Sequence, residues 1–303
     1  MILFQPIRIE AKKTYETYLF DGTERGCGYS FTNLFLWEGQ QAAVVENHLV
    51  LFSCLSCRSV YPYPAGKGDK RPVLDAIIAD AGERNIPCCL TGLREEDMQE
   101  LNRLYPDKFR IHPDRDSYDY VYEINALADL KGRKYHSKKN HLNRFRELYP
   151  DAVAEPLRDS NLPAVKSMLE AWYKTRPEQL RDNNLKKEQV ALEKALCYYK
   201  ELELETLVLR NNDEIVAVTM GSRVNPNTFD VHFEKAHPDI EGAYTAINYC
   251  FANYIRRKYP EVRFLNREED MGIDGIRKAK LSYHPHHMIV RDRAILMEDE
   301  HEY

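Results

Sequence analysis

The chain has 303 residues, of which 43% are hydrophobic, and a formal net charge of −5. This composition supports a sizeable core and excludes an intrinsically disordered chain. The first residues, MILFQPIRIEAKK, lack the pattern of a signal peptide, and no run approaches the ~18 apolar residues of a membrane span, so we expect a cytoplasmic protein.

Apolar alternation and helical periodicity predict the elements of the first half. In chain order we expect a strand at 2–9, a helical region at 10–20, a hairpin of 42–46 with 48–55 across Asn47, a strand at 58–64, a glycine loop at 65–72, a helix at 73–85, a strand at 86–93, a helix at 94–106 and a closing strand at 116–124. The pattern is typical of a mixed α/β domain.

A basic segment follows at residues 131–149, where seven Lys or Arg stand against one acid, Glu147. Its apolar residues recur with helical spacing and form one stripe. The basic residues that lie off this stripe include Lys134, Lys138, Lys139 and Arg146. Such a face suits an anionic partner, either tRNA or an anionic membrane surface. The alternative is a solvated helix that bridges two domains.

The second half predicts a strand at 152–157, a helix after Asn161 with Pro163 in its first turn, a helix at 186–203, strands at 205–210, 214–223 and 228–233, a helix at 243–258, a strand at 262–266, a helix at 273–283 and a strand at 287–293. This order is that of the GCN5-related N-acyltransferase (GNAT) fold, and the first half has a similar order. We therefore predict an α/β (α+β) chain of two tandem GNAT-like domains, 1–128 and 129–303. Each would contain a mixed, mostly antiparallel sheet flanked by helices, and the second would open with the basic helix.

Three stretches carry a family resemblance: KGRKYHSKKNHLNRF, EKAHPDIEGAYTAINYCFANYI and NREEDMGIDGIRKAKLSYHP. They resemble the bacterial proteins related to the C-terminal catalytic domain of phosphatidylglycerol lysyltransferase. That family is similar in turn to the Fem-type peptidoglycan aminoacyltransferases. The resemblance covers nearly the whole chain and is strongest from Lys131 onward. It implies tandem acyltransferase-like domains that transfer an acyl or aminoacyl group to an amine or hydroxyl, a reaction inferred by analogy.

The glycine loop before residue 243 is the predicted donor site. A helix N-terminus after a glycine offers unpaired N–H groups and a positive dipole end to an anion, and Gly242 would let a ligand approach the backbone closely. The resemblance implies donor binding by Gly242, Ala243, Tyr244 and Thr245. Two acids, Asp239 and Glu241, precede the glycine and disfavour a coenzyme A pyrophosphate. They disfavour an aminoacyl-tRNA donor less. The alternative is an ordinary strand-to-helix connection.

Strand 228–234 carries the first candidate catalytic groups. Asp230, His232 and Glu234 alternate with apolar residues and therefore share one face of the strand. A polar trio on a central strand is costly unless it is paired or hydrated. Glu234 is thus the first candidate for general base and His232 the second. The alternative for His232 is a core histidine with satisfied hydrogen bonds.

The stretch from 266 to 283 follows a predicted strand directly, where open sheets place ligand-binding groups. Asn266 is a candidate to bind a substrate amide, and Arg277 to clamp a phosphate or carboxylate. Asp270 and Glu269 are candidates to accept a proton from an attacking amine. Lys278 takes the position at which the fold often has a tyrosine that protonates the departing thiolate. The alternatives are a helix-capping turn at Asp270 and a solvated lysine at 278.

The seven cysteines are scattered, and Cys54 and Cys57 have the spacing of a metal pair that Cys88 and Cys89 could join. Each pair lies in an apolar, strand-like run. This context favours free buried thiols in a reducing compartment. We therefore expect no bound metal.

Our hypothesis is that the chain moves an aminoacyl group from aminoacyl-tRNA, or an acyl group from acyl-CoA, onto a small-molecule, lipid or peptide acceptor. The acceptor would attack directly, without a covalent enzyme intermediate or a tightly bound cofactor. Two alternatives stay open: acyl-CoA-dependent N-acetylation of a small amine, and a non-catalytic module that binds an anionic ligand. Peripheral contact with an anionic membrane and the oligomeric state also stay open.

Overall fold

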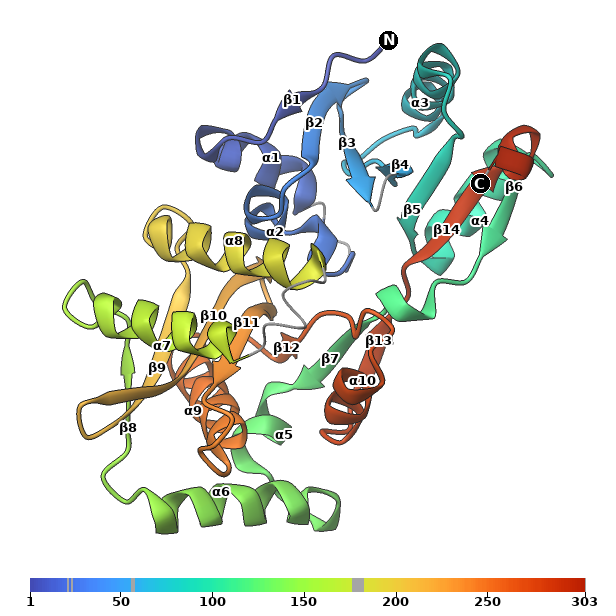
Figure 1. The fold of residues 1–303 in the computed structure, drawn as a ribbon. Helices are drawn as coiled ribbons and strands as arrows, with labels where there is room; N and C mark the ends of the chain where they lie inside the picture. The colour runs from blue at the N-terminus through green and yellow to red at the C-terminus, as the bar shows by residue number, and fades with distance from the viewer. Residues whose placement is uncertain (21, 23, 56–57, 176–182, 303) are drawn as a thin grey trace. The chain divides into compact units, whose positions relative to one another are not determined.

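The protein is described by a computed structural model that covers residues 1–20, 22, 24–55, 58–175 and 183–302. Within them the chain forms two seven-stranded sheets flanked by helices (Figure 1). Each sheet contains both antiparallel and parallel strand pairs, so the predicted mixed α/β class is confirmed. The chain divides into unit 1 (Met1–Asp119, Glu269–Asp274, Met288–Tyr303) and unit 2 (Tyr120–Glu268, Gly275–His287).

The sheet of unit 1 has the strand order β1-β2-β3-β4-β5-β14-β6. The strands are β1 (Gln5–Pro6), β2 (Gln40–Val45), β3 (His48–Leu55), β4 (Arg58–Pro62), β5 (Cys89–Leu93), β6 (Phe109–His112) and β14 (Asp292–Leu296). The helices are α1 (Lys12–Leu19), α2 (Phe31–Leu36), α3 (Arg71–Arg84) and α4 (Glu95–Leu104). The predicted hairpin across Asn47 is present, because β2 pairs with β3 in antiparallel register. The strand predicted at 2–9 is limited to Gln5–Pro6, and a 3-10 turn follows at Ile9–Ala11.

The sheet of unit 2 has the order β13-β7-β12-β11-β10-β9-β8. Its strands are β7 (Asp119–Glu123), β8 (Val153–Pro156), β9 (Glu205–Asn211), β10 (Glu214–Asn225), β11 (Thr228–Ala236), β12 (Phe264–Asn266) and β13 (His287–Ile289). The helices are α5 (Ile124–Asp129), α6 (His136–Leu148), α7 (Leu162–Lys174), α8 (Asn183–Cys197), α9 (Ala243–Lys258) and α10 (Asp274–Leu281). The basic segment predicted at 131–149 forms a 3-10 turn, Arg133–Tyr135, and then α6.

The two halves of the chain exchange their last strands. β14, drawn in red in Figure 1, lies between β5 and β6 and is antiparallel to both. β7, predicted to close the first sheet, pairs instead with β12 in the second. The strand predicted at 287–293 is divided between β13, which stays in the second sheet, and the start of β14. Alternation marks a strand but not its partner. The units also differ from the predicted division at residues 128 and 129.

Helices cover both faces of the unit 2 sheet, as two adjacent residues of β11 show. The ammonium of Lys235 donates to Glu188 Oε1 on α8 at 2.7 Å and lies 4.1 Å from the ring of Trp172 on α7. Glu234 accepts a hydrogen bond from Asn248 on α9 instead. Because neighbouring strand residues point to opposite faces, α7 and α8 cover one face and α9 the other (Figure 1).

β11 and β12 separate after a short parallel pairing. Thr228–Asp230 pair with Phe264–Asn266, whereas β11 continues to Ala236. β10 follows β11 over this whole length, so the split opens only on the β12 side. Side chains that follow β12, rather than backbone hydrogen bonds, reach β11 there.

Two further findings bear on the sequence predictions. No described helix combines the length and the apolar content that crossing a bilayer requires. Cys88 and Cys89 are buried free thiols, as predicted. Cys57 and the side chain of Cys54 lie outside the part of the chain that the structure describes.

Asp80 of α3 anchors the N-terminus and β4 in unit 1. Its carboxylate accepts hydrogen bonds from Ile2 N (2.6 Å), Tyr61 Oη (2.8 Å) and Arg84 Nε (2.7 Å). Burial raises the pKa of Asp80, but these three donors outweigh burial, and the net pKa lies below its usual value.

We expect Asp80→Asn to lower the free energy of unfolding by about 2 kcal/mol at pH 7, because Asn keeps the shape but loses the charge. A lowered folded-state pKa gives stability above the unfolded pKa of ~3.9, and that stability is lost as the pH falls through the folded pKa. The difference between wild type and variant should therefore shrink in urea titrations at pH 3. An equal difference at pH 3 and pH 7 would contradict this account.

Candidate active site in unit 2

Glu234 lies on the part of β11 that has separated from β12. Its Oε1 accepts from Arg267 at 2.9 Å and its Oε2 accepts from Asn248 at 3.2 Å. The Glu234 side chain is 12% exposed, so it is oriented on both oxygens yet retains contact with solvent. An oriented carboxylate with access to solvent has the properties of a general base.

Two cations meet at the ring of Tyr283 beside this carboxylate. Lys138 Nζ lies 4.1 Å and Arg267 Cζ 4.9 Å from the ring centroid. Burial lowers the pKa of Lys138, Arg267 lowers it further, and Glu234 raises it. Two cations against one carboxylate leave positive charge, which favours an anionic ligand such as a phosphate or carboxylate.

Two hydroxyl groups lie at the first turn of α9. Tyr283 Oη donates to Thr245 Oγ1 at 3.4 Å, and both residues are buried. Burial raises the pKa of Tyr283, so the phenol keeps its proton at neutral pH. The pair can therefore donate hydrogen bonds or a proton close to Glu234. We call Lys138, Glu234, Thr245, Asn248, Arg267 and Tyr283 the Glu234 cluster.

The predicted donor loop has a different local environment from the one expected. Gly242 has φ 79°, and a Cβ there would lie 2.5 Å from His141 O and 2.9 Å from Phe145 Cβ on α6. The close approach that this glycine permits is thus made by α6, not by a ligand. Ala243 is buried and its N–H donates to Ile240 O at 3.2 Å, whereas Tyr244 is 40% exposed.

The other predicted residues are distributed over both units. Asn266 is buried, and its Oδ1 accepts from Glu268 N at 2.8 Å, so it holds a turn. Arg277 and Lys278 lie on α10, where Lys278 is exposed. Asp270 belongs to unit 1, whereas Glu234 belongs to unit 2.

Asp270 has the contacts of a turn residue. It is buried, its Oδ1 accepts from Gly272 N at 2.9 Å, and its Oδ2 lies 3.5 Å from Arg115. These contacts match the alternative of a turn, and we do not place Asp270 in the Glu234 cluster.

The basic residues of the segment around α6 occupy two environments. Lys134, Lys139 and Arg146 are exposed, and Arg146 lies 5.0 Å from the ring centroid of Tyr249. Lys138 is half-buried against Tyr283. One of the four predicted anion-binding residues thus belongs to the Glu234 cluster, and the other three are exposed.

Arg267 and Asn248 are partners of Glu234 that were not predicted from the sequence. Asn248 lies three residues after Thr245, and both are buried on α9. Polar residues at helical spacing on the buried face of a predicted helix indicate a polar site, and this pattern could have identified Asn248. Arg267 offered no comparable local signal, because its partner lies 33 residues away in the sequence.

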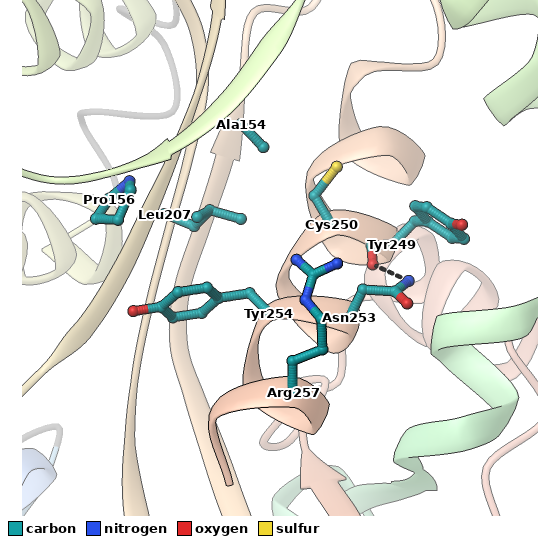
Figure 2. A pocket seen from close by; sticks show the side chains of 8 residues that line it. All are labelled: Ala154, Pro156, Leu207, Tyr249, Cys250, Asn253, Tyr254 and Arg257. Carbon is teal, nitrogen blue, oxygen red and sulfur yellow. Dashed lines mark hydrogen bonds between the residues drawn. The ribbon is translucent and has the colours of Figure 1, made fainter.

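A cavity of about 210 Å³ lies where α9 faces β8 and β9 (Figure 2). It is lined by Ala154, Pro156, Leu207, Tyr249, Cys250, Asn253, Tyr254 and Arg257. Within it Asn253 Nδ2 donates to Tyr249 O at 2.9 Å. None of the predicted site residues lines this cavity, so we do not treat it as the candidate active site.

Comparison with known proteins gives consistent matches over most of the chain. The model of the family described as "Phosphatidylglycerol lysyltransferase, C-terminal" matches residues 21–291. A solved structure of a conserved protein of unknown function from Bacteroides thetaiotaomicron is 36% identical, covers 98% of this chain and 100% of its own, and has a TM-score of 0.89. The structure of L-PGS from Bacillus licheniformis is 12% identical, covers 97% and 94%, and has a TM-score of 0.70.

More distant structures show the fold alone. A tandem GNAT protein from the clavulanic acid biosynthesis pathway and FemX are each 9% identical, with TM-scores of 0.51 and 0.55. The predicted tandem GNAT-like architecture is thereby confirmed. An uncharacterised protein, MYCGA3080 of Mycoplasmoides gallisepticum, is 27% identical over 177 residues, or 58% of this chain. That match spans 55% of the relative's own length.

Proposed function

The chain belongs to the family of phosphatidylglycerol lysyltransferase C-terminal domains, and from this premise we propose that it transfers an aminoacyl group from aminoacyl-tRNA to an amine or hydroxyl acceptor. The observation that carries the proposal is the Glu234 cluster in the split between β11 and β12, beside the first turn of α9. The family description names a lysyl group and a lipid that carries hydroxyl groups, so a lipid hydroxyl is the first acceptor to test.

In the proposed mechanism the acceptor attacks the carbonyl carbon of the aminoacyl ester directly. Glu234 takes the proton of the attacking amine or hydroxyl as the new bond to carbon forms. The ester bond to the tRNA ribose then breaks, and the departing oxygen takes a proton from Tyr283. The Thr245 hydroxyl, at the positive end of α9, stabilises the negative charge on the carbonyl oxygen. Lys138 and Arg267 bind the phosphate groups of the donor's 3′ end.

The surroundings of the donor loop favour tRNA over coenzyme A. α6 fills the space in front of Gly242, and Ala243 N already donates within the loop. Glu241 is exposed and lies 3.8 Å from Arg144, so the loop keeps an acid near its tip. A coenzyme A pyrophosphate needs backbone N–H groups there, whereas an aminoacyl ester does not. Acyl-CoA transfer is the alternative, and the experiment must distinguish it from aminoacyl transfer.

The test is a transfer assay with bulk tRNA charged with labelled amino acids and vesicles of phosphatidylglycerol. We expect label to move to the lipid or to an added amine at a rate proportional to protein. Thermal unfolding with excess acetyl-CoA runs in parallel, since a donor at 100 times its Kd adds about 2.7 kcal/mol of stability. A coenzyme A shift without tRNA binding would support the alternative. Binding of tRNA without any transfer would support a non-catalytic module.

We expect Lys138→Met to raise the Kd for aminoacyl-tRNA about tenfold, because the variant lacks the ammonium that contacts a phosphate. The ammonium is half-buried, so solvent screens its attraction to the phosphate only weakly. Lys139→Met is the matched control. It removes the same charge from the next residue, which is exposed, and should change the Kd less than about twofold. Filter binding at fixed salt concentration measures both. Equal effects would indicate non-specific attraction to α6 rather than a contact at the Glu234 cluster.

A further inference from the structure

Three side chains lie together in unit 2, and two of them precede Glu234 in the sequence of β11. They are Asp230 and His232 of β11 and Glu268, which follows β12. We propose that Asp230, His232 and Glu268, here called the Asp230 cluster, bind a divalent metal ion that ties the separated strands β11 and β12 together.

The distances suit one ion between the three ligand atoms. His232 Nδ1 lies 3.2 Å from Glu268 Oε1 and 3.5 Å from Asp230 Oδ2, and all three ligand atoms lie within 4.8 Å of one another. Ligands bound at about 2.1 Å in a tetrahedral site are about 3.4 Å apart. The side chains therefore need only small shifts to admit a metal ion.

The second ring nitrogen of His232 already has the partner that a metal-bound imidazole needs. Nε2 lies 2.7 Å from the hydroxyl oxygen of Ser222 on β10. When Nδ1 binds a metal, Nε2 carries the proton and donates a hydrogen bond to that oxygen, which fixes the tautomer and the ring orientation. β10 pairs Ser222 opposite Asp230, so one pair of strands positions both groups.

The backbone that presents Glu268 is held in an uncommon conformation. Glu268 has φ 57°, in the left-handed region that non-glycine residues rarely adopt. Asn266 Oδ1 accepts its N–H at 2.8 Å, and the Lys280 ammonium donates to its carbonyl oxygen at 3.0 Å. These two hydrogen bonds hold the Glu268 backbone and so fix the direction in which its side chain projects.

The Asp230 cluster holds two carboxylates away from solvent, which favours a nearby positive charge. The side chains of Asp230, His232 and Glu268 are 0%, 1% and 17% exposed. Two carboxylates in such surroundings favour a cation between them, and a divalent metal ion supplies that charge. Because two of the three ligands, Asp230 and His232, are fully buried, we assign the ion a structural role.

Unit 1 contains a cluster of similar composition that is built differently. Cys27, Asp119 and Glu269 also lie within reach of one ion. There Arg291 donates to Cys27 Sγ, Asp119 Oδ1 and Glu269 Oε2 at 3.1, 3.0 and 3.3 Å. The guanidinium thus supplies the cation and fills the place of a metal. In the Asp230 cluster the corresponding central group is an imidazole, which can itself act as a metal ligand.

The donor set selects the ion. One imidazole nitrogen with two carboxylate oxygens suits Zn²⁺, and Mn²⁺ or Fe²⁺ less closely, whereas Mg²⁺ and Ca²⁺ prefer sites made of oxygen alone. Zn²⁺ is therefore the probe, and Co²⁺ is its spectroscopic substitute.

The experiment measures metal content by mass spectrometry after purification and then titrates chelator-treated protein with Zn²⁺. We expect about one equivalent per chain and a rise in the unfolding midpoint of about 5 °C at 100 times the Kd. Asp230→Asn and His232→Gln should each abolish the shift. His48→Gln is the matched control, since His48 is a buried histidine of unit 1, and it should leave the shift unchanged.

The readouts do not depend on transfer activity. If the variants fail to fold, Co²⁺ bound to wild type decides: a spectrum of nitrogen and oxygen ligands without a thiolate band supports the site, and a thiolate band places the ion at a cysteine instead. The absence of saturable Zn²⁺ binding by folded wild type would overturn the proposal. Equal loss of the shift in His48→Gln and Asp230→Asn would overturn it as well.

Discussion

Glu234→Gln is expected to lower the rate of transfer by about 10²- to 10⁴-fold while the protein stays folded. The amide keeps the size of the side chain and a carbonyl oxygen for Arg267, but it cannot accept the acceptor's proton. Single-turnover transfer of labelled amino acid, with the donor saturating, measures the chemical step directly. Urea unfolding of the same preparation shows whether the folded fraction is unchanged.

Asp270→Asn is the matched control, because Asp270 is also an acid that the sequence put forward as a base. Its contacts with Gly272 and Arg115 are those of a turn in unit 1. We expect this variant to lose stability but to keep its transfer rate per folded molecule. If Asp270→Asn loses the rate and Glu234→Gln keeps it, the assignment of the general base is wrong.

Gly242→Ala is expected to lower the free energy of unfolding by about 3 kcal/mol. The added Cβ would lie 2.5 Å from His141 O, so α6 must move away from the start of α9. Such overpacking costs about 1–3 kcal/mol, and the positive φ of 79° adds about 1 kcal/mol. Urea unfolding at pH 7 measures the total.

Gly132→Ala separates the two contributions. Gly132 has φ 94°, but an added Cβ there meets nothing within 4 Å. It should therefore cost only the conformational part, about 1 kcal/mol. Equal losses at Gly132 and Gly242 would show that α6 yields without cost. In that case the close approach at Gly242 would no longer explain why glycine stands there.

Local pattern determined the order of the elements in the second half of the chain. The helix predicted at 243–258 is α9, and the alternation of 228–234 placed Asp230, His232 and Glu234 on one face of β11. These results follow because helical and strand periods are written into neighbouring residues. The same alternation identified Glu234 as a polar residue on a central strand without information about its hydrogen-bond partners.

Only the tertiary structure decided how these elements combine. Arg267 and Glu268 reach Glu234 and His232 from 33 and 36 residues away, across a split that begins where β12 ends. β7 was predicted to close the first sheet, and the last predicted strand, 287–293, is divided between β13 and β14. β7 and β14 nevertheless each join the sheet of the other half of the chain. Strand partners and side-chain pairs depend on contacts between distant residues, and a local period carries no information about them.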